Sequence, residues 1–155
     1  MLEETVGKLL MEKQLTIACA ESCTGGLLTS CLTDVEGSSA YVMGSVVSYT
    51  NEVKESLVGV KHETLVTHGA VSEATVREMA EGIRHVIGTA LGVGITGIAG
   101  PGGGTETKPV GLVYIAVAGD KGTTVKKNIF YGSRMENKRS SVEKALEMLH
   151  AYLYQ

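Results

Sequence analysis

Apolar residues follow two different spacings along the chain, one typical of amphipathic helices and the other of buried strands. Helical spacing occurs over residues 2–13, after Gly26, after Ser72 and after Ser133. Short and nearly continuous apolar runs alternate with these segments and predict strands at 15–20, 41–50, 90–100 and 109–119. Helices interleaved with buried strands predict a layered α/β fold.

The helix ends and the last two strands show more local signals. Ser72 is a favoured N-cap residue, and Ser133 with Glu136 has the pattern of a capping box. A further run at 123–132 alternates less regularly, as an edge strand does, and the turn DKG joins it to the preceding strand. Two strands joined by so short a turn form a hairpin, so we expect a mixed sheet.

Composition and charge narrow the class of protein. The 155 residues are 43% hydrophobic and 20% charged, which is typical of one soluble globular domain spanning residues 1–155. A formal net charge of -3 gives no basic footprint for a nucleic acid backbone, and no apolar run is long enough to span a membrane. The N-terminal segment is acidic, unlike an export signal, and three cysteines without a paired motif indicate free thiols rather than a metal site. We therefore expect a cytoplasmic protein that binds neither nucleic acid nor membrane.

The glycines of the third predicted strand match a nucleotide-binding pattern but not its context. Gly92, Gly94 and Gly97 have the spacing G-x-G-x-x-G of the dinucleotide fingerprint. That fingerprint works only where the glycines lead from a strand directly into a helix. Here Pro101 and further glycines follow, which prevents a prompt helix. We therefore expect no dinucleotide site, and the absence of Gly-Lys-Ser/Thr excludes a P-loop.

Two glycine-containing turns, ESCTGG (21–26) and TGIAGPGGGT (96–105), directly follow predicted strands. In open α/β sheets ligands bind beyond the carboxyl ends of the strands, so both turns can line one crevice. Their backbone N–H groups suit an anion or an oxyanion. The alternative for the first turn is structural, with Ser22 or Thr24 as a helix cap. Cys23 is a weaker candidate nucleophile, because no histidine stands in a recognisable partner motif.

A third group of polar residues lies between residues 36 and 57 and contains Ser38, Ser39, Tyr49 and Lys54. A serine needs a base to become a nucleophile, and a desolvated neutral lysine can serve where no Ser-His-Asp pattern exists. The alternative is that the serines form a turn and Lys54 lies on a solvated helix face.

Arg134 lies in the first turn of the predicted C-terminal helix. A cation there opposes the helix dipole unless both face the same anion. With Lys138 and Arg139 nearby, Arg134 can hold a phosphate, and the alternative is an exposed arginine without a ligand.

Several long motifs occur in a fixed order: AESCTGG, GSSAY, SYTNEVK, GVKHETLVTHGAVSEATVREMAEG and TGIAGPGGGTETKPVGLVYIAVAG. From about residue 5 to the end, the chain resembles the CinA C-terminal domain family. The resemblance implies a single three-layer α/β/α domain with a mixed, mostly parallel sheet. It also implies hydrolysis of the carboxamide of nicotinamide mononucleotide to nicotinate mononucleotide and ammonia, without a metal or an organic cofactor.

The resemblance further implies roles for individual residues. By their positions in the motifs, Ser39 is the expected nucleophile, Lys54 its base and Tyr49 an assisting hydroxyl. The expected substrate-binding residues come from other motifs: Ser22, Thr24, Gly25, Gly26, Thr96, Gly97, Gly100 and Arg134. In this interpretation Ser22 holds the substrate and Ser39 attacks it.

The chain departs from the family pattern at two places. It reads GSR where the family often reads GDR, and GPGGG where the family often reads GPDGG. The alternative function is a nucleotide-binding or regulatory domain without turnover, which needs the glycine turns and Arg134 but not Ser39 and Lys54 together. In either case we expect a homodimer that binds a small-molecule nucleotide.

Overall fold

Five strands form one mixed sheet in the order β2-β1-β3-β4-β5. The computed structural model describes residues 1–155. The strands are β1 Ile17–Glu21, β2 Val42–Val47, β3 Leu91–Gly97, β4 Leu112–Gly119 and β5 Gly122–Ile129. β1 pairs in parallel with β2 and β3, whereas β4 pairs antiparallel with β3 and β5. β4 alone runs against the other strands, which confirms the predicted mixed and mostly parallel sheet.

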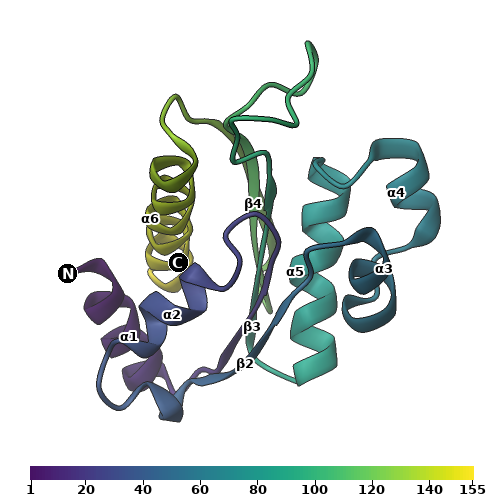
Figure 1. Cartoon of the computed structure of the whole chain (residues 1–155). Helices are drawn as coiled ribbons and strands as arrows, with labels where there is room; N and C mark the ends of the chain where they lie inside the picture. The colour runs from purple at the N-terminus through teal and green to yellow at the C-terminus, as the bar shows by residue number, and fades with distance from the viewer.

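Helices cover both faces of the sheet (Figure 1). α1, α2 and α6 lie on one face, and α5 lies on the other with α3 and α4 beside it. The helices are α1 Leu2–Lys13, α2 Leu27–Thr33, α3 Asn51–Val53, α4 His62–His68, α5 Glu73–Ile87 and α6 Arg134–Leu153. Two short helical segments complete the chain, the 3-10 turn η1 Ser38–Ala40 and the π-helical η2 Lys54–Val58. The expected three-layer architecture is confirmed.

The predicted capping signals are present. Ser72 Oγ accepts a hydrogen bond from the Thr75 N–H at 3.1 Å, where α5 begins. Ser133 Oγ accepts from the Glu136 N–H, and Glu136 Oε1 accepts from the Ser133 N–H at 2.9 Å. This reciprocal pair is the capping box of α6. Ser133 therefore serves as the N-cap of α6.

The glycines of β3 allow α5 to pack closely against the sheet. A Cβ atom added at Gly92 would lie 2.2 Å from the Ala80 carbonyl oxygen. One added at Gly94 would lie 2.7 Å from the Val76 carbonyl oxygen. Both distances are too short for any side chain in a packed interior. Two glycines of the G-x-G-x-x-G pattern therefore serve helix–sheet packing, and no helix begins directly after β3.

The main hydrophobic core lies between the sheet and the layer of α1, α2 and α6. Leu10, Leu28 and Leu149, one from each helix, are fully buried in it. Smaller clusters fill the space between the sheet and α5. None of the helices is at once long enough and apolar enough to cross a membrane.

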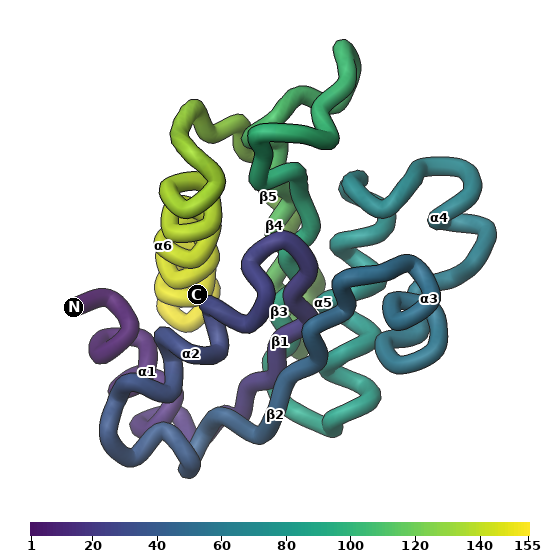
Figure 2. Tube along the Cα trace, viewed as in Figure 1, coloured from purple at the N-terminus to yellow at the C-terminus, as the bar shows by residue number.

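The direction of the strands decides which segments meet. β1, β2 and β3 run in the same direction, so the segments that follow them lie together at the carboxyl ends of these strands (Figure 2). These segments are the turn before α2, residues 48–54 and the loop 98–111. The amino ends of the same strands lie on the opposite side, and η1 lies there because it directly precedes β2.

Candidate active site

A cavity of about 290 Å³ lies at the carboxyl ends of β1, β2 and β3. Its lining includes seven of the residues predicted for the site: Ser22, Tyr49, Lys54, Thr96, Gly97, Gly100 and Arg134. Cys23 also lines it, as do Ala70 and Val71 from the segment before α5, which the sequence did not suggest. Segments far apart in the chain therefore converge on one site.

Lys54 is buried within this site, with 1% of its surface exposed. Its Nζ donates to the carbonyl oxygens of Ser48 at 2.8 Å and Tyr49 at 3.4 Å, and to Ser22 Oγ at 3.1 Å. None of the salt bridges in the protein includes Lys54. Burial therefore lowers the pKa of Lys54 below its ordinary value of 10.5. A lysine with a lowered pKa can lose its proton and act as a base toward Ser22.

The local backbone explains why this lysine points inward. Thr50 caps α3 by accepting a hydrogen bond from the Val53 N–H at 3.2 Å. The chain then continues into η2, which begins at Lys54 and whose Leu57 stays exposed. π-Helical turns are rare and occur often at functional sites. Because Lys54 is buried, the alternative of a lysine on a solvated helix face is wrong.

Ser22 directly follows β1, and its backbone N–H donates to the Ile95 carbonyl at 2.9 Å. The preceding Glu21 is fully buried. Its carboxylate accepts four hydrogen bonds: from Thr24 Oγ1, Thr29 Oγ1 and the backbone N–H groups of Leu28 and Thr29. A side-chain carboxylate therefore already occupies the positive N-terminus of α2. Sequence reasoning missed Glu21, although an acid at the end of a buried apolar strand is a usable signal.

Three residues expected to face the substrate shape the turn instead. Thr24 is 1% exposed, and its hydroxyl donates to Glu21 Oε1 at 2.6 Å. Gly25 and Gly26 have φ of 61° and 102°, a left-handed conformation that suits glycine. None of the three lines the cavity. Their place in the structure is to lead the chain from Ser22 into α2.

The structure does not bring Ser39 and Lys54 together. Ser39 is exposed in η1, which precedes β2, whereas Lys54 follows β2. A strand of six residues spans roughly 20 Å, so the two side chains lie near opposite ends of β2. The neighbouring Ser38 donates to the Thr33 carbonyl at 3.5 Å. The expected pairing of Ser39 with Lys54 is therefore corrected: the hydroxyl in contact with Lys54 is that of Ser22.

Arg134 joins three parts of the site. Its Nη1 donates to the Gly100 carbonyl at 2.7 Å, and its Nη2 donates to Tyr49 Oη at 3.3 Å. The buried Asn137, three residues further along α6, donates from Nδ2 to the Ala99 carbonyl at 3.0 Å. These contacts hold the loop after β3 against α6. Sequence reasoning did not single out Asn137.

The remaining lining residues are fixed or chemically quiet. Thr96 Oγ1 donates to the Ala70 carbonyl at 2.9 Å, and a Cβ atom at Gly97 would lie 2.7 Å from the Leu112 carbonyl oxygen. Burial raises the pKa of the Cys23 thiol to about 11, so little thiolate exists at neutral pH. No three metal-ligating side chains lie close enough together to hold an ion.

A model of the CinA C-terminal domain matches residues 1–153. The chain belongs to the CinA C-terminal domain family. It is 48% identical over 152 residues to a competence-damage inducible protein of Acetivibrio thermocellus, and 48% identical over 152 residues to a CinA-like protein of Endomicrobium trichonymphae. Each match covers 98% of this chain, which spans 37% of the first relative and 36% of the second.

Solved structures of the family have the same fold. A CinA superfamily protein from Klebsiella pneumoniae superposes with a TM-score of 0.95 at 33% identity, over 99% of this chain and 96% of that one. A competence/damage inducible protein from Agrobacterium tumefaciens gives a TM-score of 0.91 at 41% identity, over 100% of this chain and 97% of that one. The family's fold therefore extends over the whole chain.

Proposed function

We propose that this site hydrolyses the carboxamide of nicotinamide mononucleotide, with Ser22 as the nucleophile and Lys54 as its base. The observation that supports the proposal is the 3.1 Å contact between Lys54 Nζ and Ser22 Oγ inside a cavity of about 290 Å³. A hydroxyl with an adjacent desolvated lysine is a known arrangement for covalent catalysis. The relatives' names say only that they are competence-damage inducible or CinA-like, so the substrate is our proposal.

The reaction proceeds in two stages. The neutral Lys54 amine takes the proton of Ser22 as Oγ attacks the carboxamide carbon and forms a C–O bond. The tetrahedral intermediate then collapses, the C–N bond breaks, and Lys54 returns the proton to the leaving nitrogen, which departs as ammonia. Water attacks the resulting ester with Lys54 again as base, which releases nicotinate mononucleotide and restores Ser22.

The oxyanion of each tetrahedral intermediate needs hydrogen-bond donors. The backbone N–H group of Cys23, which lines the cavity, directly follows the nucleophile and donates to no backbone carbonyl. We assign the oxyanion to this group, because a preorganised backbone donor stabilises such a charge in acyl transfer. Glu21 and the glycines hold this turn in place, which gives the residues around Ser22 a positioning role.

The phosphate of the mononucleotide needs a separate anion site, because Glu21 already occupies the N-terminus of α2. Arg134 and Lys138 lie one turn apart on α6. The Lys138 Nζ is 3.8 Å from the position that a Cβ atom of Gly25 would take, and its charge acts on the Cys23 thiol. We assign the phosphate to these two cations.

Ammonia release from nicotinamide mononucleotide by the purified protein tests the proposal. Nicotinamide riboside, which lacks the phosphate, should react with a kcat/KM lower by at least about tenfold, which corresponds to one lost charge-assisted contact. Lys138→Met should reduce this difference. Binding of the mononucleotide without ammonia release would favour the regulatory alternative, and neither binding nor release would reject the proposed substrate.

Two further expectations belong to the same proposal. The three cysteines are free, which suits a reducing compartment such as the cytoplasm. A homodimer is expected for the purified chain, and light scattering should give twice the mass of one chain. A mass of one chain at working concentration would reject the dimer but leave the catalytic proposal intact.

A further inference from the structure

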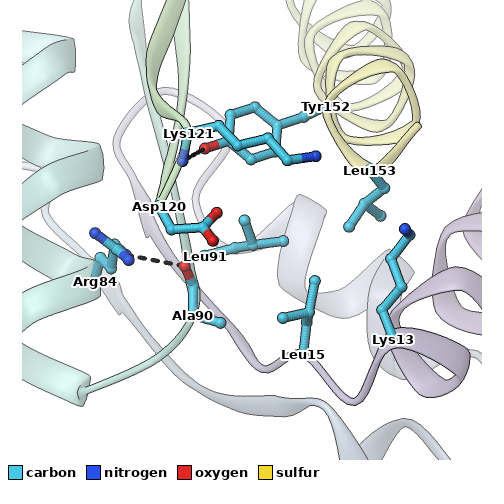
Figure 3. Close-up of a pocket in the computed structure, with 9 residues that line it drawn as sticks. All are labelled: Lys13, Leu15, Arg84, Ala90, Leu91, Asp120, Lys121, Tyr152 and Leu153. Carbon is cyan, nitrogen blue, oxygen red and sulfur yellow. Dashed lines mark hydrogen bonds between the residues drawn. The ribbon is translucent and has the colours of Figure 1, made fainter. Parts of the chain in front are cut away.

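A second cavity lies near the start of β3, at the opposite end of this strand from the candidate active site. Figure 3 shows the residues that line it. Its volume is about 310 Å³, and it forms where the end of α1, the C-terminal part of α5, the start of β3, the β4–β5 turn and the end of α6 meet. It shares no lining residue with the active-site cavity. The proposed amide hydrolysis gives this second cavity no role.

The inner wall of the second cavity is apolar. Leu91 and Leu153 are each 2% exposed, and Leu15 beside them is half-buried. The hydroxyl of Tyr152 is fully engaged, since it donates to the Gly122 carbonyl at 2.9 Å and accepts from the Lys121 N–H at 3.1 Å. Tyr152 therefore offers its ring rather than its hydroxyl. This wall suits an apolar ring.

The rim of the cavity is charged. It consists of three cations, Lys13, Arg84 and Lys121, and one carboxylate, Asp120. None of these side chains takes part in a salt bridge of the protein. Lys121 Nζ already donates to a main-chain oxygen of Gln155, the last residue, so its charge is offset there. Lys13 and Arg84 against Asp120 leave a formal excess of one positive charge, in a chain whose formal net charge is -3. The rim therefore attracts anions.

Two of the cations are held in place before any ligand binds. Arg84 Nε donates to the Ala90 carbonyl at 2.9 Å, which orients the guanidinium and leaves its terminal nitrogens without a partner (Figure 3). Lys121 Nζ lies 5.8 Å from the centre of the Tyr152 ring and donates to the terminal main-chain oxygen of Gln155. Donors fixed in this way lose less entropy when a ligand binds.

We propose that this cavity is a binding site for a small organic anion with an apolar ring. The ring packs on the wall of Leu91 and Leu153, and the anionic group meets the cations at the rim, with Arg84 as its main partner. Asp120 opposes a second negative charge at the same place. A ring-bearing monocarboxylate is therefore the preferred ligand over the corresponding phosphate dianion.

Titration of the full chain with benzoate, followed by amide chemical shifts, tests the proposal. Benzoate should bind saturably with a Kd on the order of 1 mM, the range open to so small a ligand. The shifts should centre on Leu91 and Lys121. Acetate lacks the ring and benzylamine has the opposite charge, so each should bind at least about fivefold more weakly. Phenyl phosphate should also bind more weakly than benzoate.

Matched variants separate a built site from loose attraction to surface charge. Arg84→Gln should weaken benzoate binding about fivefold or more, whereas Lys8→Gln, on an exposed position of α1 outside the cavity, should leave it unchanged. Asp120→Asn should tighten binding, an effect that a misfolded variant cannot produce. Equal binding of benzoate and benzylamine, or an equal effect of Arg84→Gln and Lys8→Gln, would overturn the proposal.

Discussion

Lys54 Nζ lies 3.1 Å from Ser22 Oγ, although 32 residues separate the two in the chain. Ser22 follows β1 and Lys54 follows β2. Because these neighbouring strands are parallel, their carboxyl ends lie side by side. The contact is therefore a consequence of the topology. It defines the catalytic pair of our proposal.

Replacing Lys54 by methionine removes the proposed base while keeping an unbranched side chain of similar length. We expect kcat/KM for ammonia release to fall by about 10²–10⁴-fold, the usual contribution of a general base. Lys54→Arg should not restore activity, because a guanidinium stays protonated. Lys61→Met, on an exposed lysine outside the cavity, is the matched control. Activity in Lys54→Met within tenfold of wild type would remove Lys54 from the mechanism.

The pH dependence of activity should follow Lys54. Only its neutral amine accepts the Ser22 proton, so kcat/KM should rise with pH and level off above the lowered pKa of Lys54. That plateau should begin below pH 10.5, the ordinary value for lysine. A rate that falls as the pH rises from 6 to 9, with the fold intact, would contradict a lysine base.

The same titration links Lys54 to stability. Between its lowered folded pKa and 10.5, the unfolded chain binds more protons at this site than the folded protein. The free energy of unfolding should therefore rise with pH across this window, and the destabilisation is complete below the folded pKa. Urea unfolding of wild type and Lys54→Met at several pH values measures the effect. The free energy of unfolding of Lys54→Met minus that of wild type should decrease as the pH rises, because only wild type gains stability at this site. A difference that stays constant with pH would contradict the lowered pKa.

Glu21→Gln should damage both the fold and the activity. The carboxylate accepts four hydrogen bonds while fully buried, and an amide nitrogen cannot accept the bonds made to one of its oxygens. We expect a loss of about 2–4 kcal/mol in the free energy of unfolding, together with a lower kcat from a displaced Ser22 turn. Glu63→Gln, at an exposed glutamate of α4, should change neither. Wild-type stability in Glu21→Gln would show that the carboxylate does not hold the turn.

Cys23→Ala should retain activity within about threefold of wild type, because the thiol is neutral and is assigned no chemical step. Burial raises its pKa to about 11, so iodoacetamide should modify Cys23 in the folded protein far more slowly than in the unfolded chain at pH 7. Peptide mapping by mass spectrometry follows this reaction. Loss of ammonia release in Cys23→Ala with the fold intact would return the thiol to the list of nucleophiles.

Most of the fold could be predicted from the sequence because its signals are local. The apolar runs, the Ser72 cap and the Ser133–Glu136 capping box each act within a few residues, and the structure confirms them. The segment α4 was harder, since it is only about two turns long. The burial of Lys54 at the start of η2 involves a tertiary contact with Ser22, which follows β1.

The site was predictable in its region but not in its pairing. The rule that ligands lie beyond the carboxyl ends of strands pointed to the turns that contain Ser22 and Thr96, and both residues line one cavity. Applied to β2, the same rule excludes Ser39, which lies before that strand. The resemblance to the family nevertheless assigned the attack to Ser39. Strand order and direction were needed to see that Ser22 and Lys54 are neighbours. No local sequence pattern predicts the order or the direction of the strands.

Ammonia release by Ser22→Ala and Ser39→Ala, measured side by side with wild type, tests the central claim most directly. Ser22→Ala should reduce kcat by about 10³-fold or more while the protein stays folded, because the attacking oxygen is gone. Ser39→Ala should keep a kcat close to that of wild type, because its exposed side chain lies beyond the other end of β2. Normal turnover in Ser22→Ala, or its loss in a folded Ser39→Ala, would contradict the assignment of Ser22 as the nucleophile.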